Sequence, residues 1–493
     1  MSGPGYVGVE TEYGITVDGP TPVNPVVASS LVVSAYRAAG PGEVRWDHTD
    51  ESPLVDAREP RRVPSLEPMI DDELGLANAV LTNGARFYVD HAHPEYATPE
   101  CTNARDLLIW DRAGERILAD AAERASASLP AGSRVLIHKN NTDGKGAAYG
   151  THENYLVARS VPFGRLTYRL VPFFVSRPLL IGAGRVGSHL DASIEFQLTQ
   201  RADFFEVVLG LETTLKRPLM NTRDEPHADP DRYRRLHVIN GDANLCEVAT
   251  YLKVGTMLLV LAAIEDEALP EPPELADPVA AFHAVSHDLT GRVALPLASG
   301  GRITPVELQR WYLEVVTDHL AGRSGTEVER DVLARWREGV EVAAEDPRLL
   351  TGLADWATKL ELLEQYRGRH GLGWQHDRLK MLDLQYHDVR VERGLYHRLA
   401  ARGRVVQLVS DEEVEAAVTT PPTDTRAWFR GEVIRRFGSQ VVAAGWDAIV
   451  LDTGGERLQR VPMREPGRGT REQLGALLDE VHDTAELLAR LTA

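Results

Sequence analysis

A strict alternation of polar and apolar side chains in the segment RFYVD limits what this chain can fold into. Arg86, Tyr88 and Asp90 alternate there with Phe87 and Val89. Successive side chains of a β-strand point to opposite faces, so the two apolar residues can face a core while the three polar residues line the other face. The pattern predicts a sheet with one packed face and one polar face, and such a polar row requires a ligand or a partner.

A second strand-like segment, GVETEYG, places two acids on one face. Glu10 and Glu12 are two residues apart, and two carboxylates this close are destabilising unless cations hold them. Two solvated acids on an exposed face are the better interpretation of this segment taken alone. Residues 86–90 and Glu95 make a metal site the better interpretation, because they add hard oxygen ligands and a guanidinium suited to phosphate. Together the two segments indicate magnesium and phosphate chemistry.

Two longer stretches add candidate ligands and leave their alternatives open. Residues 138–157 contain several glycines but not the spacing of a P-loop, and His152 within them is either a metal ligand or an ordinary loop histidine. Residues 221–244 bring Arg223 and other arginines close to His237 in an otherwise acidic chain. This basic patch suits an anionic ligand, and solvated arginines are the alternative.

Two other motifs are weaker. Residues 182–187, GAGRVG, satisfy the dinucleotide-binding spacing, but a loop and a strand are predicted after them where a helix is required, so we interpret them as a flexible loop. The segment HAHPEY could hold a transition metal through His91 and His93, although a lone H-x-H pair is common by chance.

Composition excludes several classes of protein. The formal net charge of -19, from 54 basic and 73 acidic residues, argues against non-specific binding to nucleic acid or to an anionic membrane. The two cysteines form no CxxC motif, and the amino terminus does not resemble a signal peptide, so a cytoplasmic location is expected. The longest apolar run, residues 254–264, is shorter than the ~20 residues that span a bilayer and predicts a buried helix.

The order of predicted elements suggests a large mixed unit followed by a small one. The chain opens as strand then helix, and residues 41–79, rich in acids and proline, predict a long flexible insertion. Helices predominate over residues 245–389, where Thr304 begins a capping box. Prolines and threonines at residues 418–425 break the pattern, and a small separate module is predicted after them.

The motifs GVETEYGI, NGARFYVDHAHPEYATPEC, KNNTDGKGAAYGTHENYLV, NTRDEPHAD, RRLHVINGDAN and TRAWFRG occur along the chain in this order. Together they resemble the family formed by Pup ligase and Dop, the deamidase and depupylase of the prokaryotic ubiquitin-like protein Pup. The resemblance spans nearly the whole chain. It implies an α+β fold, with a glutamine synthetase-like domain over residues 1–420 and a small carboxy-terminal domain over residues 421–493. In the larger domain a curved, mainly antiparallel sheet packed by helices would form a cradle for ATP and magnesium.

The resemblance also implies a role for individual residues. Asp90 resembles the family's catalytic aspartate, acting as nucleophile or as general base. The implied magnesium ligands are Glu10, Tyr88 and Glu95 for one ion and Glu12, His152 and His237 for a second. The implied nucleotide or phosphate contacts are Arg86, Thr98, Arg223 and Trp446, with Arg426 and Arg430 as weaker candidates.

Two features favour the Dop branch over the ligase branch. The predicted insertion at residues 41–79 matches one that Dop carries and the ligase lacks, and VDHAHPEY is closer to Dop than to the ligase pattern LDVGSHPEY. The resemblance then implies a monomeric hydrolase, dependent on magnesium and on ATP or ADP plus phosphate, that deamidates the carboxy-terminal glutamine of Pup and releases Pup from pupylated proteins. A Pup ligase that works through a glutamyl phosphate is the alternative, and a non-catalytic Pup-binding regulator is a further one.

Overall fold

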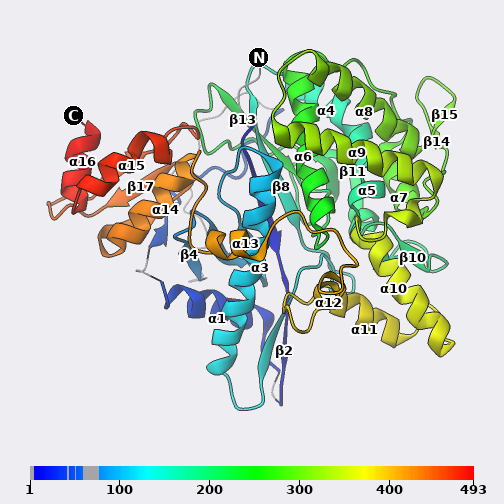
Figure 1. Ribbon diagram of the computed structural model, residues 1–493, viewed down its shortest axis with the longest axis horizontal. Coiled ribbons are helices and arrows are strands. Elements are labelled where there is room, and N and C mark those ends of the chain that lie inside the picture. The colour runs from blue at the N-terminus through cyan, green and yellow to red at the C-terminus, as the bar shows by residue number, and fades with distance from the viewer. Residues whose placement is uncertain (1–4, 21, 41–43, 50, 59–76, 493) are drawn as a thin grey trace.

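A six-stranded antiparallel sheet lies at the centre of the molecule (Figure 1). The computed structural model describes residues 5–20, 22–40, 44–49, 51–58 and 77–492. The strand order is β13-β8-β1-β6-β5-β4, and each neighbouring pair is antiparallel. The strands are β1 (Val7–Glu12), β4 (Asn78–Val80), β5 (Arg86–Asp90), β6 (His93–Ala97), β8 (Thr151–Ala158) and β13 (Tyr233–Val238).

Helices cover the apolar face of this sheet, as the alternation in RFYVD predicts. Phe87 and Val89 are buried, and the helix α1 (Pro25–Arg37) packs on β5 and β6. The long helix α3 (Ala104–Ala127) packs on β1, and α6 (Glu247–Glu265) packs on β8. The opposite face of the sheet is therefore left to the polar row.

The region from residue 163 to residue 417 is mainly helical and includes α6. By length and composition, α6 is the one described helix apolar enough to cross a membrane, but 89% of its most apolar window is buried inside the protein, so it is a core helix. The predicted capping box at Thr304 is confirmed at the start of α8. The other helices of this region are α4 (Phe163–Ser176), α5 (Pro178–Ile181), α7 (Pro278–His287), α8 (Pro305–Ala321), α9 (Glu327–Glu345), α10 (Asp355–His370), α11 (Asp377–Tyr386), α12 (Leu395–Ala400) and α13 (Asp411–Ala417).

Short strands at the margins complete this part. The pairs are β2 (Gly14–Asp18) with β7 (Arg134–His138), β9 (Arg185–Val186) with β10 (Phe196–Gln197), β11 (Phe205–Gly210) with β12 (Arg217–Asn221), and β14 (Leu295–Pro296) with β15 (Arg302–Ile303). The GAGRVG stretch follows the helix α5 and runs into β9. It thus lacks the strand–turn–helix context of a dinucleotide site, as predicted.

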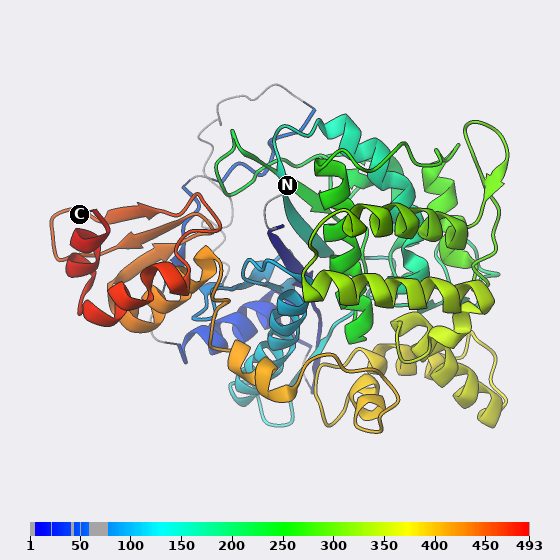
Figure 2. The same ribbon diagram turned by 45° about the horizontal axis from the view of Figure 1, so that its top comes forward.

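The carboxy-terminal part forms a second, smaller sheet at one side of the molecule (Figure 2). Its order is β18-β17-β16-β3, and it packs with helices around a core of its own. The elements are β16 (Val441–Ala444), β17 (Ala448–Leu451), β18 (Gln459–Pro462), α14 (Arg426–Phe437), α15 (Arg471–Glu480) and α16 (Thr484–Thr492). The strand β3 (Arg45–Trp46) comes from the amino-terminal part, so this sheet is not built from residues 421–493 alone. The domain boundary at residue 420 stays a prediction.

The described part of the predicted insertion at residues 41–79 is tied into the fold. The strand β3 pairs with β16, and β4 pairs with β5. Between them, the backbone N–H of Ala57 donates to Thr222 O at 2.8 Å, and that of Asp224 donates to Val55 O at 2.8 Å. Residues 41–43, 50 and 59–76 of the predicted insertion lie outside the described residues, so its flexibility stays a prediction.

Candidate active site

The register of the central sheet brings the predicted polar residues onto one face. Directly opposite residues of antiparallel strands project to the same side. Glu12 on β1 pairs with Glu95 on β6, and Glu95 pairs with Tyr88 on β5. One step along the same strands, Glu10 lies opposite His152 on β8. The motifs that are far apart in the sequence are therefore neighbours across the sheet.

Three acids of this face form a compact group. Glu12, Asp90 and Glu95 each offer a carboxylate oxygen, and these oxygens lie within 4.8 Å of one another. Glu95 is only 3% exposed. Burial raises its pKa well above the usual value, and the charges of Asp90, Glu10 and Glu12 raise it further. Three carboxylates at this spacing repel one another, and a hard cation relieves the repulsion, so the all-oxygen donor set fits magnesium.

A second group lies beside the first and consists of Glu10, His152 and His237. The ring of His237 has its Nδ1 atom 2.8 Å from Asn154 Oδ1, while its buried Nε2 atom has no hydrogen-bond partner. A histidine that donates through one nitrogen and keeps a lone pair on the other is suited to binding a metal ion. A carboxylate oxygen and two imidazoles can thus hold a second ion. This group and the group of Glu12, Asp90 and Glu95 are called the two acid groups.

The structure groups the predicted metal ligands differently from the grouping that the family resemblance implies. The resemblance places Glu10 with Tyr88 and Glu95, and Glu12 with the two histidines. In the structure Glu10 lies with His152 and His237, whereas Glu12 lies with Glu95. The reason is the register, because Glu10 pairs with His152 and Glu12 pairs with Glu95. The assignment of each residue as a ligand stays a prediction.

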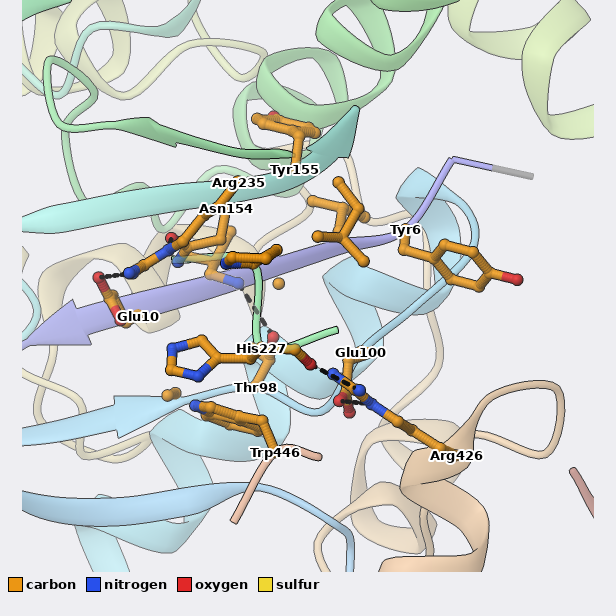
Figure 3. Close-up of a pocket in the computed structure, with 16 residues that line it drawn as sticks. Tyr6, Glu10, Thr98, Glu100, Asn154, Tyr155, His227, Arg235, Arg426 and Trp446 are labelled. Atoms are coloured by element: carbon orange, nitrogen blue, oxygen red, sulfur yellow. Dashed lines mark hydrogen bonds and ion pairs between the residues drawn. The ribbon is translucent and has the colours of Figure 1, made fainter. Parts of the chain in front are cut away.

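A pocket opens at the amino-terminal end of β1 (Figure 3). Arg235 contacts Glu10 at one end of it, and Arg426 contacts Glu100 at the other. The residues that line it are Tyr6, Val7, Gly8, Val9, Glu10, Ala97, Thr98, Glu100, Asn154, Tyr155, Leu156, Pro226, His227, Arg235, Arg426 and Trp446. The structure thus places three of the predicted nucleotide contacts, Thr98, Arg426 and Trp446, around one pocket next to the Glu10 group.

Arg430, a weaker candidate for a nucleotide contact, lies behind the pocket wall. Its side chain is fully buried, and it donates to Glu100 and to the carbonyl oxygens of Gly84 and Trp446. Arg426 is also bound to Glu100, at 2.7 Å. Arg430 is fully buried and does not line the pocket, so its place is that of a support for the pocket rather than of a direct contact.

Arg86 is held between two aromatic rings. Its guanidinium carbon lies 4.0 Å from the ring centre of Trp46 and 3.9 Å from that of Tyr88. Its Nε atom donates to Asn78 Oδ1 at 3.2 Å. Trp46 also meets Trp446 edge to face at 5.2 Å. Sequence reasoning missed Trp46, because it falls in the predicted insertion and only the pairing of β3 with β16 reveals its position.

The candidate catalytic residue, Asp90, lies at the end of β5. Its side chain is 40% exposed, and its Oδ2 atom lies 3.0 Å from Nδ1 of His91, whose φ of 52° is in the left-handed region. Arg223 lies near Asp90 and Glu10, and its buried Nε atom has no hydrogen-bond partner. Burial lowers the pKa of Arg223, and the nearby charge of Arg235 lowers it further.

The transition-metal interpretation of HAHPEY gains no support among the described residues, whose metal-binding groups contain neither histidine of that motif. His93 instead stacks on Tyr149 at 4.2 Å, with its Nδ1 atom 3.2 Å from Glu12 Oε2. His91 contacts Asp90. Both histidines therefore border the acid group from the outside.

The site has a direction along the sheet. β1 and β5 run parallel to each other, because both are antiparallel to β6. The pocket of Figure 3 lies beside the first residues of β1, the two acid groups follow at Glu10 and Glu12, and Asp90 lies at the far end of β5. A ligand in the pocket would thus approach Asp90 from the end of the sheet where β1 begins.

Comparison with known proteins agrees with this geometry. The model of the family described as Pup-ligase protein matches residues 6–450. The chain belongs to this family. Among solved structures, the Pup ligase PafA in its complex with Pup covers 99% of this chain and 94% of its own, with a TM-score of 0.81 and 32% identity. The same ligase in complex with ADP covers 88% of this chain and 98% of its own, with a TM-score of 0.74 and 34% identity.

Relatives within the Pup-ligase family fall into two named groups. A depupylase of Acidothermus cellulolyticus is 54% identical over 99% of both chains, and a Pup deamidase/depupylase of Mycolicibacterium smegmatis is 49% identical over 99% of both chains. A Pup–protein ligase of Arthrobacter is 41% identical over 96% of this chain and 98% of its own. The predicted α+β fold is therefore confirmed, and it is the fold of the Pup ligases.

Proposed function

We propose that this protein is a Pup deamidase and depupylase. It converts the carboxy-terminal glutamine of Pup to glutamate and hydrolyses the isopeptide bond between Pup and a lysine of a target protein. The observation that carries the proposal is the higher identity to depupylases, 49–54% over 99% of the chain, than to the ligase of Arthrobacter, 41% over 96%. The motif VDHAHPEY around Asp90 supports the same branch.

The pocket supports a nucleotide as cofactor. A structural relative is a Pup ligase in complex with ADP, and the pocket joins an aromatic ring, Trp446, to arginines beside the acid groups. We assign the pocket to ATP, or to ADP with phosphate, with Arg86 and Arg223 as contacts for phosphate oxygens. The two acid groups would hold magnesium, which supplies positive charge to offset an oxyanion that develops on the scissile carbonyl.

Asp90 would carry the chemistry. Deamidation and depupylation break the same bond, between the side-chain carbonyl carbon and nitrogen. As a nucleophile, Asp90 attacks that carbon, the nitrogen leaves with a proton as ammonia or as the lysine amine, and water hydrolyses the resulting anhydride. As a general base, Asp90 takes a proton from the attacking water. Its 40% exposed side chain at the end of β5 is accessible to substrate in either role.

A single-turnover reaction in H₂¹⁸O tests whether Asp90 is the nucleophile. If Asp90 is the nucleophile, hydrolysis of the anhydride can place ¹⁸O in the Asp90 carboxylate, and mass spectrometry of the peptide that contains Asp90 detects it. If Asp90 is a general base, the label enters only the product glutamate. Label in Asp90 establishes the nucleophile, whereas label in the product alone is expected both for a general base and for water attack on the glutamyl carbonyl of the anhydride. The hydrolase proposal stands in either case.

Pup and pupylated proteins are the proposed partners, since a structural relative is a Pup ligase in complex with Pup. Pup is acidic and disordered, so it would fold on a groove of this protein with help from local basic patches. The stretch that offers such a patch is residues 393–404, which surrounds α12; the other basic stretch, residues 232–237, lies mostly in β13 and contributes Arg235 and His237 to the site instead. We propose a monomer as the working form.

The test is mass spectrometry of Pup ending in glutamine, and of a Pup–lysine isopeptide conjugate. Each is incubated with this protein and Mg²⁺, with and without ATP, and with Asp90→Asn as the control variant. A gain of about one dalton on the first substrate and release of the second, both lost without nucleotide and in the variant, are expected. Conjugation of Pup ending in glutamate, with matching release of ADP and no cleavage, would instead identify a ligase.

A further inference from the structure

Two buried arginines lie beside the acid groups without a carboxylate partner. Arg201 is 1% exposed and Arg217 is 9% exposed. Among the residues that the structure describes, neither guanidinium forms an ion pair within 4.0 Å. Arg201 donates only to main-chain oxygens, those of Ile239 and Gly241, and its buried Nε atom has no partner. Arg217 also donates only to main-chain oxygens, at 2.8 and 2.7 Å.

Most other buried arginines of this chain have a carboxylate partner, with Arg185 as an exception among the described residues. Arg177 is paired with Glu153 at 2.7 Å, Arg112 with Glu115 at 2.7 Å, and Arg430 with Glu100. A buried charge without a counter-ion is costly, so it normally has one. Burial lowers the pKa of Arg201 to about 10, and the charge of Arg217 adds to this shift, while the charges of Glu12 and Asp242 oppose it without cancelling it. Two like charges side by side, away from water, indicate that an anion completes this part of the molecule.

The position of the pair fits the substrate end of the site rather than the nucleotide end. Ile239, which Arg201 contacts, follows the last residue of β13, and Ala148, which Arg217 contacts, precedes the first residue of β8. The last residue of β13, the first residue of β8 and the last residue of β1, Glu12, lie at the same end of the strands. The charge of Glu12 acts on both arginines. β5 runs parallel to β1, so its last residue, Asp90, also lies at this end of the strands, whereas the nucleotide pocket lies at the opposite end.

We infer that Arg201 and Arg217 bind the free α-carboxylate of the substrate's carboxy-terminal residue, an inference that rests on the proposed function. In both proposed reactions the scissile bond belongs to the side chain of that residue. Its main-chain carboxylate therefore stays free, ionised and only a few bonds from the reacting carbon. Guanidinium groups match the planar geometry of a carboxylate and can bind it through two parallel hydrogen bonds. The arginine pair would fix the terminal residue so that its side-chain carbonyl meets Asp90.

The experiment uses two Pup substrates that differ in one group. One ends in glutamine with a free α-carboxylate, and the other ends in glutamine with an α-carboxamide. Deamidation of both is measured as kcat/KM for the full chain and for Arg217→Gln, with saturating ATP and Mg²⁺. For the wild type we expect kcat/KM to be roughly 30-fold lower on the carboxamide substrate than on the free acid, because charge-assisted hydrogen bonds to the arginines are lost. Arg217→Gln should lower kcat/KM on the free acid by a similar factor relative to the wild type. For this variant, kcat/KM on the carboxamide should be little lower than on the free acid.

Three controls make the result decisive. Arg367→Gln removes another arginine without an ion pair among the described residues, one that lies over Trp374 at 5.1 Å, and it should keep the full discrimination between substrates. Arg201→Lys, which keeps the charge but loses the fork, should show partial loss. ADP affinity and the thermal midpoint of each variant show whether it is folded.

Other outcomes would overturn the inference. If a folded Arg217→Gln still discriminates about 30-fold, the pair does not bind the α-carboxylate. If the wild type treats both substrates alike, and Arg217→Gln changes only the concentration of inorganic phosphate needed for activity, the anion is phosphate. If the wild type deamidates neither substrate, the proposed function itself fails, which is a distinct result.

Discussion

Two clusters of charge lie on opposite faces of the central sheet and differ in how their charge is balanced. On the helix-covered side, Lys139 Nζ lies 2.6 Å from Asp111 Oδ2 and 2.9 Å from Glu115 Oε1. On the polar side, Glu12, Asp90 and Glu95 approach one another within 4.8 Å. The first cluster contains its own cations, whereas the second concentrates negative charge.

The pKa of a glutamate in each cluster shows the difference. Burial by itself raises the pKa of both Glu115 and Glu95. For Glu115 the charges of Arg112 and Lys139 outweigh burial and the net shift is downward, whereas for Glu95 the neighbouring acids add to burial and the shift is strongly upward. A cluster that balances its own charge stabilises the fold, and one that does not requires a ligand. This distinction separates structural from functional charge in a chain where both are buried.

The largest expected effect comes from unbalancing the structural cluster. Lys139→Met leaves Asp111 and Glu115 without their shared cation, so the free energy of unfolding should fall by ~3–5 kcal/mol. Urea denaturation measures it. The matched control is Lys380→Met, because Lys380 is 55% exposed and lies 3.7 Å from an exposed Asp377, and this change should cost less than ~0.5 kcal/mol. Equal losses in the two variants would contradict the comparison.

The functional cluster should respond in the opposite way. Glu95→Gln removes one of three repelling acids, so the metal-free protein should be as stable as the wild type or more stable. Activity should nevertheless fall about 100-fold, equivalent to ~2.7 kcal/mol of transition-state stabilisation. Calorimetry with and without Mg²⁺, together with the cleavage assay, measures both quantities. A metal-free variant that is clearly less stable than the wild type would show that Glu95 is structural.

A third prediction uses pH on a balanced pair at the edge of the pocket. Burial raises the pKa of Glu100, but the charges of Arg430 and Arg426 outweigh it and lower the pKa to about 2. The folded pKa lies below the ordinary value of 4.5, so the stabilisation is present above pH 4.5 and is lost as the pH falls toward 2. Between pH 7 and pH 3 the wild type should lose ~2 kcal/mol more than Glu100→Gln does. Identical slopes of unfolding free energy against pH would refute this pairing.

The sequence predicts the strands of the site well and the partners of its residues poorly. Strand period alone puts Glu10 and Glu12 on one face, and the motifs identify the family. The grouping of ligands depends on register, which pairs residues more than 80 positions apart, and no local pattern encodes it. Composition likewise cannot tell that Arg430 is paired with Glu100 while Arg201 is unpaired, because both are arginines in mixed segments.

Trp46 shows the same limit and leads to the smallest predicted effect. Its ring covers the Arg86 guanidinium at 4.0 Å, and its Nε1 atom donates to Glu51 Oε1 at 2.6 Å, which fixes the ring in this position. Trp46→Leu should weaken ADP binding about fivefold, close to the ~1 kcal/mol of a partly buried cation–π contact, and should leave kcat at saturating nucleotide unchanged. Isothermal titration measures the affinity. Trp311→Leu, which removes a tryptophan of α8 packed on Tyr312, should not change ADP affinity. If Trp46→Leu lowers kcat and leaves affinity intact, Arg86 acts on the reacting carbonyl rather than on the nucleotide, and the positive charge at this end of the sheet belongs to the chemical step.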